Sequence, residues 1–200
     1  RDLVRGQFRG YRNENGVAKD SATETFAAVK LEINSWRWKG VPFYIRAGKN
    51  LPVTCTEILG RFRKPPSLFA AEALEENHLR LRLSPEVTIA MGMMVMTPGE
   101  ELSAETIEMV ASRFPHAGAI DAYERVLGGA MEGDATMFAR EDYVEEAWRI
   151  VDPVLKTATP IYEYEANTWG PNEVERVTPA GGWSNPTLGE EAFTIAQKAA

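Results

Sequence analysis

Apolar side chains recur at every second position along much of residues 24–112, which is the period of a β-strand with one buried face. The alternation is clearest at residues 78–83, where three leucines are predicted to point inward and His78, Arg80 and Arg82 outward. Glycines and prolines divide the pattern into short runs, so it predicts several strands joined by hairpin-length turns. The predicted strands cover residues 3–12, 24–34, 41–47, 54–63, 78–83, 87–95 and 104–112.

The hydrophobic period changes to that of a helix after residue 119. Apolar residues from Ile120 onward repeat at helical spacing, and a second helical stripe follows an acidic start and runs toward Leu155. Pro153 is expected to kink this second helix or to end it at Asp152. From Thr159 onward the sequence is rich in proline, glycine and aromatic residues without a period, which indicates an extended arm anchored by its rings.

The order of strands and helices predicts an α+β fold. Strands come first and helices follow, so we expect a large, mostly antiparallel β-sheet with helices packed on one face and an extended C-terminal arm. In the predicted strand 24–34, Ala27, Val29, Leu31 and Ile33 are predicted to form the buried face. No Gly-x-Gly-x-x-Gly follows a predicted strand and no βαβ units alternate, so the chain does not carry its own dinucleotide-binding half.

Charge and cysteine content narrow the classes of partner. The net charge of −7 argues against nucleic acid or an anionic membrane as a partner, since both select basic surfaces. The sequence has no apolar run of 18 residues and only one cysteine, Cys55, which fits a reducing compartment, so we expect a cytoplasmic protein. Because the chain starts at Arg1 without Met or an apolar leader, we also expect a segment upstream.

The candidate binding residues are cations near predicted strand ends. Arg46 and Lys49 flank Gly48 at the end of one strand, and Arg82 lies near the end of another, an arrangement that suits an anionic ligand. Such cations are more often only solvated, so this alternative stays open. His78 and His116 are both explained by surface positions, and no histidine or cysteine cluster has metal-binding spacing.

Several separate stretches of the sequence resemble one known family. They are ETFAAVKL (24–31), WKGVPFYIRAGK (38–49), DAYER (121–125), FAR (138–140), EEAWR (145–149) and TWGP (168–171). In this order they resemble the C-terminal domain of glucose-6-phosphate dehydrogenase, over residues 1–185. The resemblance leaves residues 186–200 as a tail that is either disordered or only locally helical.

The resemblance implies an oxidoreductase of glucose metabolism. Members oxidise glucose 6-phosphate to 6-phosphogluconolactone, reduce NADP and thereby open the pentose phosphate pathway. Their N-terminal Rossmann domain binds NADP and supplies the catalytic base, whereas the C-terminal domain completes the sugar site and forms the dimer. This chain resembles only the second part, so we expect no catalytic residue and no metal in it, and no activity from it in isolation.

The resemblance also assigns substrate-binding residues by position. Lys49 matches the substrate-binding lysine of the family, whereas Thr54 and Ser84 replace a basic residue and a glutamine that contact substrate in other members. Some members bind a second, structural NADP on this domain. Arg46 and Arg82 match two of its basic positions, but Cys55 and Leu59 occupy two others. We therefore expect these arginines to support the site or to pair with acidic residues, and expect no structural NADP.

Two interpretations follow from these observations. In the first, the chain is the substrate-binding and dimerisation domain of the dehydrogenase, and it forms a homodimer through its sheet. In the second, prompted by Thr54 and Ser84, it is a non-catalytic sugar-phosphate-binding or oligomerisation module. Methionines at strand spacing and the pair Trp36 and Trp38 are predicted to pack in the core or at a subunit contact under either interpretation.

Overall fold

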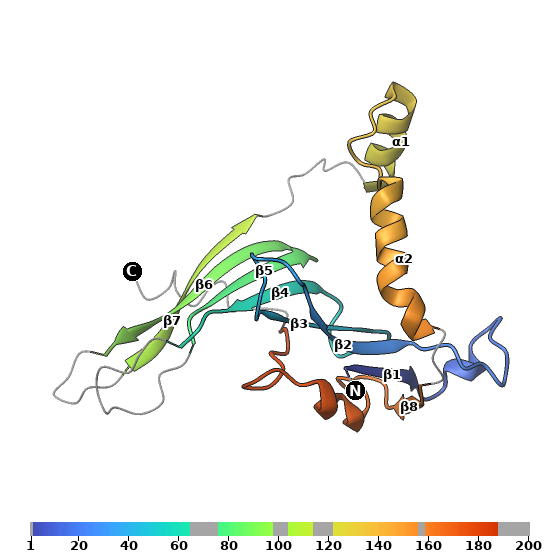
Figure 1. Ribbon diagram of the computed structural model, residues 1–200, viewed down its shortest axis with the longest axis horizontal. Helices are drawn as coiled ribbons and strands as arrows, with labels where there is room; N and C mark the ends of the chain where they lie inside the picture. The colour runs from blue at the N-terminus through green and yellow to red at the C-terminus, as the bar shows by residue number, and fades with distance from the viewer. Residues whose placement is uncertain (1, 65–75, 98–103, 114–121, 156–158, 188–200) are drawn as a thin grey trace. The chain divides into compact units, whose positions relative to one another are not determined.

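The computed structural model describes residues 2–64, 76–97, 104–113, 122–155 and 159–187. The chain divides into two compact units (Figure 1), one formed by residues 1–114 and 161–200 and the other by residues 115–160. His116, residues 67–75 of the stretch 67–77 that is predicted as a loop or short helix, and residues 188–200 of the predicted tail lie outside the described residues.

The first unit holds a four-stranded sheet with the strand order β3-β2-β1-β8. Its strands are β1 (Leu3–Phe8), β2 (Phe26–Glu32), β3 (Pro42–Gly48) and β8 (Ile161–Tyr164). β2 pairs antiparallel with both β1 and β3, whereas β8 pairs parallel with β1. A 3-10 helix, η1 (Tyr11–Asn13), follows β1.

The core of this sheet lies on the face opposite to the predicted one. Phe26 and Ala28 are 2% and 0% exposed, whereas Val29 is only half-buried and Ile33 is 44% exposed. The register explains the reversal. Phe26 lies opposite Gly6 of β1 and belongs to the face that residues 165–187, the C-terminal segment, cover. The predicted buried face of Ala27, Val29, Leu31 and Ile33 is therefore wrong, although the alternation itself is present.

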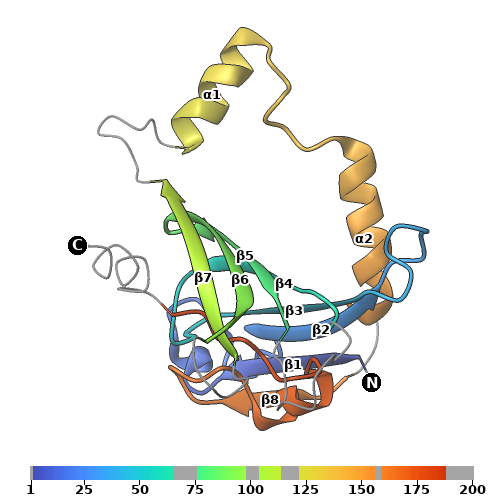
Figure 2. The same ribbon diagram turned by 90° about the vertical axis from the view of Figure 1, so that its left-hand side faces the viewer.

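The C-terminal segment supplies the cover. After β8, the 3-10 helix η2 (Asn172–Val177) contacts β1 and β2, and Val177 is 3% exposed in the core. Trp183 packs against the same cluster. Figure 2 shows this segment, in orange and red, beside β1 and β8. The segment predicted as an extended arm thus contains a strand, a 3-10 helix and core residues.

A second four-stranded sheet, also in the first unit, is antiparallel throughout with the order β4-β5-β6-β7. Its strands are β4 (Thr56–Arg61), β5 (His78–Ser84), β6 (Val87–Met96) and β7 (Ala104–Arg113). The predicted mostly antiparallel arrangement is confirmed, with the strands divided between two sheets.

The inward and outward faces of β5 are also the reverse of the prediction. The Arg80 and Arg82 side chains are each only 12% exposed, whereas Leu83 is 54% exposed. Acidic side chains pair with both arginines, which offsets the cost of burying them. Arg61, on the same face of β4, donates hydrogen bonds to the carbonyls of Ala180 and Gly182, so the C-terminal segment contacts this face. Of the leucines predicted to point inward, Leu79 and Leu81 are only half-buried and Leu83 is exposed, and they share an apolar face with the exposed Ile58 and Ile89.

The described residues of the second unit form two helices, α1 (Ala122–Glu132) and α2 (Glu141–Leu155). Glu141 and Asp142 occupy the first turn of α2, where the helix dipole favours negative charge. α2 continues through Pro153 to Leu155, so it does not end at Asp152. Both helices confirm the α+β class; their packing on one face of a sheet stays a prediction. Neither described helix has the length and apolarity needed to cross a membrane.

Candidate functional site

The candidate site begins at the end of β3. The β-prone residues Phe43, Tyr44 and Ile45 pair along β2, and the strand ends at Gly48, opposite Phe26. A Cβ atom on Gly48 would lie only 2.8 Å from the Phe26 ring, so only glycine lets this strand end pack against the core. Lys49 therefore leaves the sheet from a closely packed point.

The backbone of the turn after β3 is held by three hydrogen bonds. Lys49 donates its N–H to the Thr25 carbonyl at 2.8 Å, and its own carbonyl accepts the Tyr164 hydroxyl at 2.8 Å. The next carbonyl, that of Asn50, accepts the N–H of Asn167 at 2.8 Å. The Lys49 side chain is exposed, and no other described residue pairs with its ammonium. A fixed backbone thus carries an open positive charge.

The two predicted hydroxyl contacts, Thr54 and Ser84, are both exposed. Thr54 is exposed on the same β3–β4 connection as Lys49, and Ser84 is exposed at the end of β5, paired in register with Thr56. Within the described residues, no hydrogen bond joins the side chains of Lys49, Thr54 and Ser84. The structure places all three on the surface beside the ends of β3 and β5 and the start of β4.

Arg82 is not an open cation. Its Nε and Nη2 atoms donate to Oε2 of Glu57 at 3.0 and 2.7 Å, and Glu57 is itself only 9% exposed. Arg80 Nη1 lies 3.8 Å from the same oxygen. With Glu57 neutralising it in a buried position, Arg82 cannot also serve as an unpaired anion-binding group without losing this partner.

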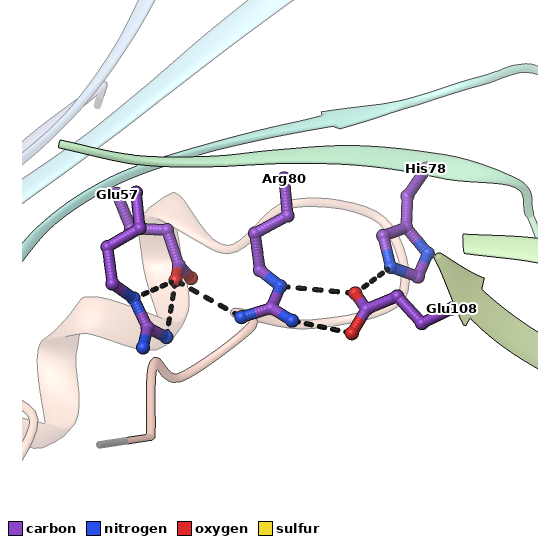
Figure 3. Close-up of polar contacts among 5 residues, drawn as sticks. Glu57, His78, Arg80 and Glu108 are labelled. Atoms are coloured by element: carbon purple, nitrogen blue, oxygen red, sulfur yellow. Dashed lines mark hydrogen bonds and ion pairs between the residues drawn. The ribbon is translucent and has the colours of Figure 1, made fainter. Parts of the chain in front are cut away.

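The pairing continues across the sheet as a charged network (Figure 3). Arg80 donates from Nε and Nη2 to the two carboxylate oxygens of Glu108 at 3.1 and 2.5 Å, and His78 Nε2 lies 3.2 Å from Glu108. Burial raises the pKa of Glu108, but the hydrogen bonds from Arg80 and His78 outweigh it and leave the pKa below its ordinary value. This network balances charge inside the fold and offers no excess positive charge to a ligand.

Sequence reasoning missed Glu57 and Glu108 as partners. The signal that could have found them is strand parity, because both acids lie on the face of their strands that carries Arg80 and Arg82. Finding them also required the strand order, since Glu108 lies on β7, two strands away from β5.

Arg46 contacts two tryptophan rings. Its guanidinium carbon lies 4.5 Å from the centre of the Trp169 ring and 4.7 Å from that of Trp183, and its Nη2 donates to Oδ1 of Asn185 at 2.6 Å. Burial lowers the pKa of Arg46. The guanidinium ties β3 to the C-terminal segment through cation–π contacts, three residues before Lys49.

A hollow of about 340 Å³ lies near the start of the C-terminal segment, and its lining does not suit an anionic ligand. Three carboxylates, those of Glu163, Glu165 and Glu173, line it. Its single lining arginine, Arg9, already pairs with Glu163 and Glu165. Among the residues that the structure describes, no group of three or more histidine, cysteine or acidic residues could hold a metal ion.

Known proteins are similar to this chain in sequence and in fold. The family model described as "Glucose-6-phosphate dehydrogenase, C-terminal domain" matches residues 1–184. The chain is 41% identical to the glucose-6-phosphate 1-dehydrogenase of Aggregatibacter actinomycetemcomitans, covering 93% of this chain and 41% of that protein. It is 38% identical to glucose-6-phosphate 1-dehydrogenase 1 of Mycobacterium tuberculosis strain H37Rv, covering 92% and 40%.

Two solved structures agree with these matches. The crystal structure of glucose-6-phosphate 1-dehydrogenase from Mycobacterium avium superposes with a TM-score of 0.83 at 38% identity, covering 94% of this chain and 41% of that one. A structure described as glucose-6-phosphate dehydrogenase in complex with its substrate glucose-6-phosphate gives a TM-score of 0.78 at 26% identity, covering 93% and 42%. The chain spans about two fifths of the length of these relatives and belongs to the C-terminal domain family of glucose-6-phosphate dehydrogenase.

Proposed function

We propose that this chain is the sugar-phosphate-binding part of a glucose-6-phosphate 1-dehydrogenase, which oxidises D-glucose 6-phosphate to 6-phosphogluconolactone and reduces NADP in the cytoplasm. The observation that carries the proposal is Lys49, whose exposed ammonium extends from a backbone held by three hydrogen bonds. One solved relative is described in complex with glucose 6-phosphate, which supports this substrate.

Lys49 would bind an oxygen of the substrate's phosphate or sugar. An ammonium group is a compact charge with three donors, so it can neutralise a phosphate or donate to a hydroxyl oxygen. The hydroxyls of Thr54 and Ser84 would add weaker, neutral hydrogen bonds. Arg46 and Arg82 would support the site indirectly, since stacking on tryptophans holds the first and Glu57 holds the second.

The reaction needs two further groups, which we assign to a nucleotide-binding Rossmann domain. NADP would accept the hydride, and a base would take the proton from the sugar hydroxyl. Of the chain's two histidines, His78 pairs with Glu108, and His116 lies outside the described residues. The part played by this chain is therefore to bind and orient the sugar phosphate.

A second, structural NADP on this domain fits the residues poorly. Four positions are basic in members that bind a structural NADP, and two of them are uncharged here, at Cys55 and Leu59. Glu57 neutralises Arg82, and the Arg46 guanidinium is in contact with the Trp169 and Trp183 rings. A nucleotide carries several negative charges, and these positions offer it no open cation.

The substitution that tests the substrate assignment is Lys49→Met, which removes the charge and keeps a similar length. In a full-length dehydrogenase that carries this domain, we expect KM for glucose 6-phosphate to rise by about tenfold or more, because a charge-assisted bond to the substrate is lost. Lys39→Met is the matched control, since Lys39 is also an exposed lysine near β3. Unchanged kinetics for Lys49→Met would refute the assignment.

We further propose that the open apolar face of β4–β7 forms a homodimer contact. Ile58, Ile89 and Met109 lie on this face and are 53%, 52% and 55% exposed. Ile89→Lys should shift the protein toward monomers in analytical ultracentrifugation. Ile45→Lys, at a residue of the first sheet that is 50% exposed, is the matched control and should leave the oligomeric state unchanged.

The alternative interpretation is a non-catalytic sugar-phosphate-binding or oligomerisation module. Thr54 and Ser84 favour it, because they replace the stronger substrate contacts of other members. An assay of NADP reduction with glucose 6-phosphate in the full-length protein separates the two: turnover supports the dehydrogenase, and its absence with the dimer intact supports the module.

A further inference from the structure

We propose that Tyr164 is a positioning residue for Lys49. The inference rests on the proposed role of Lys49 in binding glucose 6-phosphate. The Tyr164 hydroxyl lies 2.8 Å from the Lys49 carbonyl oxygen, although the two residues are 115 positions apart in the chain. No other described side chain bonds to the backbone of Lys49.

The hydrogen bonds around the hydroxyl assign its single proton to Lys49. The Phe8 N–H donates to Oγ1 of Thr25 at 2.9 Å, and this Oγ1 lies 3.1 Å from the Tyr164 oxygen, to which it can donate. The Tyr164 proton then goes to the Lys49 carbonyl at 2.8 Å in preference to the Thr25 carbonyl at 3.2 Å. The relay Phe8–Thr25–Tyr164–Lys49 satisfies each group in turn.

The ring of Tyr164 is fixed by packing, so its hydroxyl cannot follow a moving turn. Tyr164 is 4% exposed, and its ring centre lies 5.5 Å from that of Phe26 and 6.4 Å from that of Phe8. A Cβ atom added at Gly6 would lie only 3.1 Å from the Tyr164 ring, which shows how closely β1 packs against it. Burial also raises the pKa of Tyr164, which keeps the proton on the donor.

This anchor fixes the direction in which the Lys49 side chain leaves the backbone. The carbonyl of Lys49 belongs to the peptide plane that joins it to Asn50, which has a left-handed φ of 51°. The Tyr164 bond to this carbonyl and the Lys49 N–H bond to the Thr25 carbonyl restrain the backbone on both sides of the Lys49 Cα. Without the first bond, ψ of Lys49 could change and the Cα could shift, which would displace an ammonium at the end of four methylenes. A ligand contact made by this ammonium depends on a fixed backbone, because a small rotation of the backbone at the Lys49 Cα displaces the ammonium by a larger distance.

The test is Tyr164→Phe in a full-length dehydrogenase that carries this domain. The substitution removes one hydroxyl and keeps the packed ring. We expect KM for glucose 6-phosphate to rise about threefold to tenfold, which corresponds to one neutral hydrogen bond. We expect kcat and KM for NADP to change less than about twofold, since the bond acts on the sugar site alone.

Tyr162→Phe is the matched control. Tyr162 lies on the same strand, and its hydroxyl accepts a hydrogen bond at 3.0 Å from the exposed Arg176. It makes no hydrogen bond to the described backbone of Lys49 or Asn50. This variant should leave KM unchanged. A fall in melting temperature for Tyr164→Phe with no change in KM would overturn the inference, because a purely structural tyrosine would give that result.

A double variant separates this inference from the function on which it rests. On the Lys49→Met background, Tyr164→Phe should raise KM no further, because the group that it positions is gone. An equal rise on both backgrounds would overturn the inference. If Lys49→Met alone leaves KM unchanged, the proposed function fails instead. Should Tyr164→Phe not fold, Thr25→Val, which removes the hydroxyl that orients Tyr164, should still raise KM about twofold to threefold; no rise would contradict the proposal.

Discussion

The two sheets of the first unit differ in what covers their apolar side chains. In β3-β2-β1-β8, the chain's own C-terminal segment covers Phe26, Ala28 and their neighbours, which are almost fully buried. In β4-β5-β6-β7, the buried face carries the charged network of Glu57, Arg80 and Glu108, and the apolar face is open.

This difference shows how the two sheets can serve different functions. A sheet that the chain covers by itself holds its edges rigidly, which suits a residue such as Lys49 that must keep its position. A sheet whose apolar face is open has unburied surface that a second copy can cover. We therefore expect substitutions in the first sheet to affect stability and substrate binding, and substitutions on the open face of the second to affect assembly.

The largest expected effect is that of Phe26→Ala, which opens a cavity in the covered core. Loss of this 2% exposed ring should lower the free energy of unfolding by about 3 to 5 kcal/mol. Ile89→Ala, at a 52% exposed residue of the second sheet, should cost about 1 kcal/mol or less in the monomer. Urea denaturation measures both, and equal costs would break the distinction between the sheets.

Glu57→Gln should have the next largest effect, because it removes the shared acid of Arg80 and Arg82 within the buried face. Arg80 keeps Glu108, but Arg82 is left buried with a weaker partner, which should lower the free energy of unfolding by about 2 to 3 kcal/mol. Glu146→Gln is the control, because its pair with Arg149 is on the surface of α2 and should matter little. Similar losses for both variants would argue against a stabilising network.

Arg46→Met tests the attachment of the C-terminal segment to β3. Without the cation that contacts Trp169 and Trp183, the free energy of unfolding should fall by about 1 to 2 kcal/mol. The tryptophan fluorescence of the folded variant should also differ from that of the parent protein, because both rings lose a neighbouring cation. An unaltered melt and spectrum would show that the stacking contributes nothing.

The smallest expected effect is the pH dependence contributed by Glu108. Its folded pKa is depressed, so its ionised form contributes stability above the unfolded pKa of about 4.3, and this contribution is lost as the pH falls through the folded pKa. Glu108→Gln should therefore lower stability at neutral pH more than at about pH 3. A difference from the parent protein that is constant with pH would contradict this sign.

The sequence predicts the elements of the first unit better than their faces. Alternation locates β2 and β5 correctly, but a period of two defines two faces without saying which is covered. That choice depends on distant residues: Val177 and Tyr164 cover Phe26, and Glu108 neutralises Arg80. Apolar residues were therefore predicted inward on β5, where paired charges are buried instead.

The candidate site is only partly predictable for the same reason. Lys49 is found from its place after Gly48 and from the resemblance to the family. Its anchor, Tyr164, belongs to β8, a four-residue strand that was predicted as part of an arm because the sequence there shows no extended period. A contact between residues 49 and 164 depends on the parallel pairing of β8 with β1, which no local pattern reveals.

The most direct test of the central claim is a crystal structure of the full-length dehydrogenase that carries this domain, with glucose 6-phosphate bound. The account predicts that Nζ of Lys49 lies about 2.8 Å from an oxygen of the substrate, with the Tyr164 hydroxyl still bonded to the Lys49 carbonyl. A substrate bound with Lys49 directed into solvent, more than about 6 Å from every substrate oxygen, would contradict it.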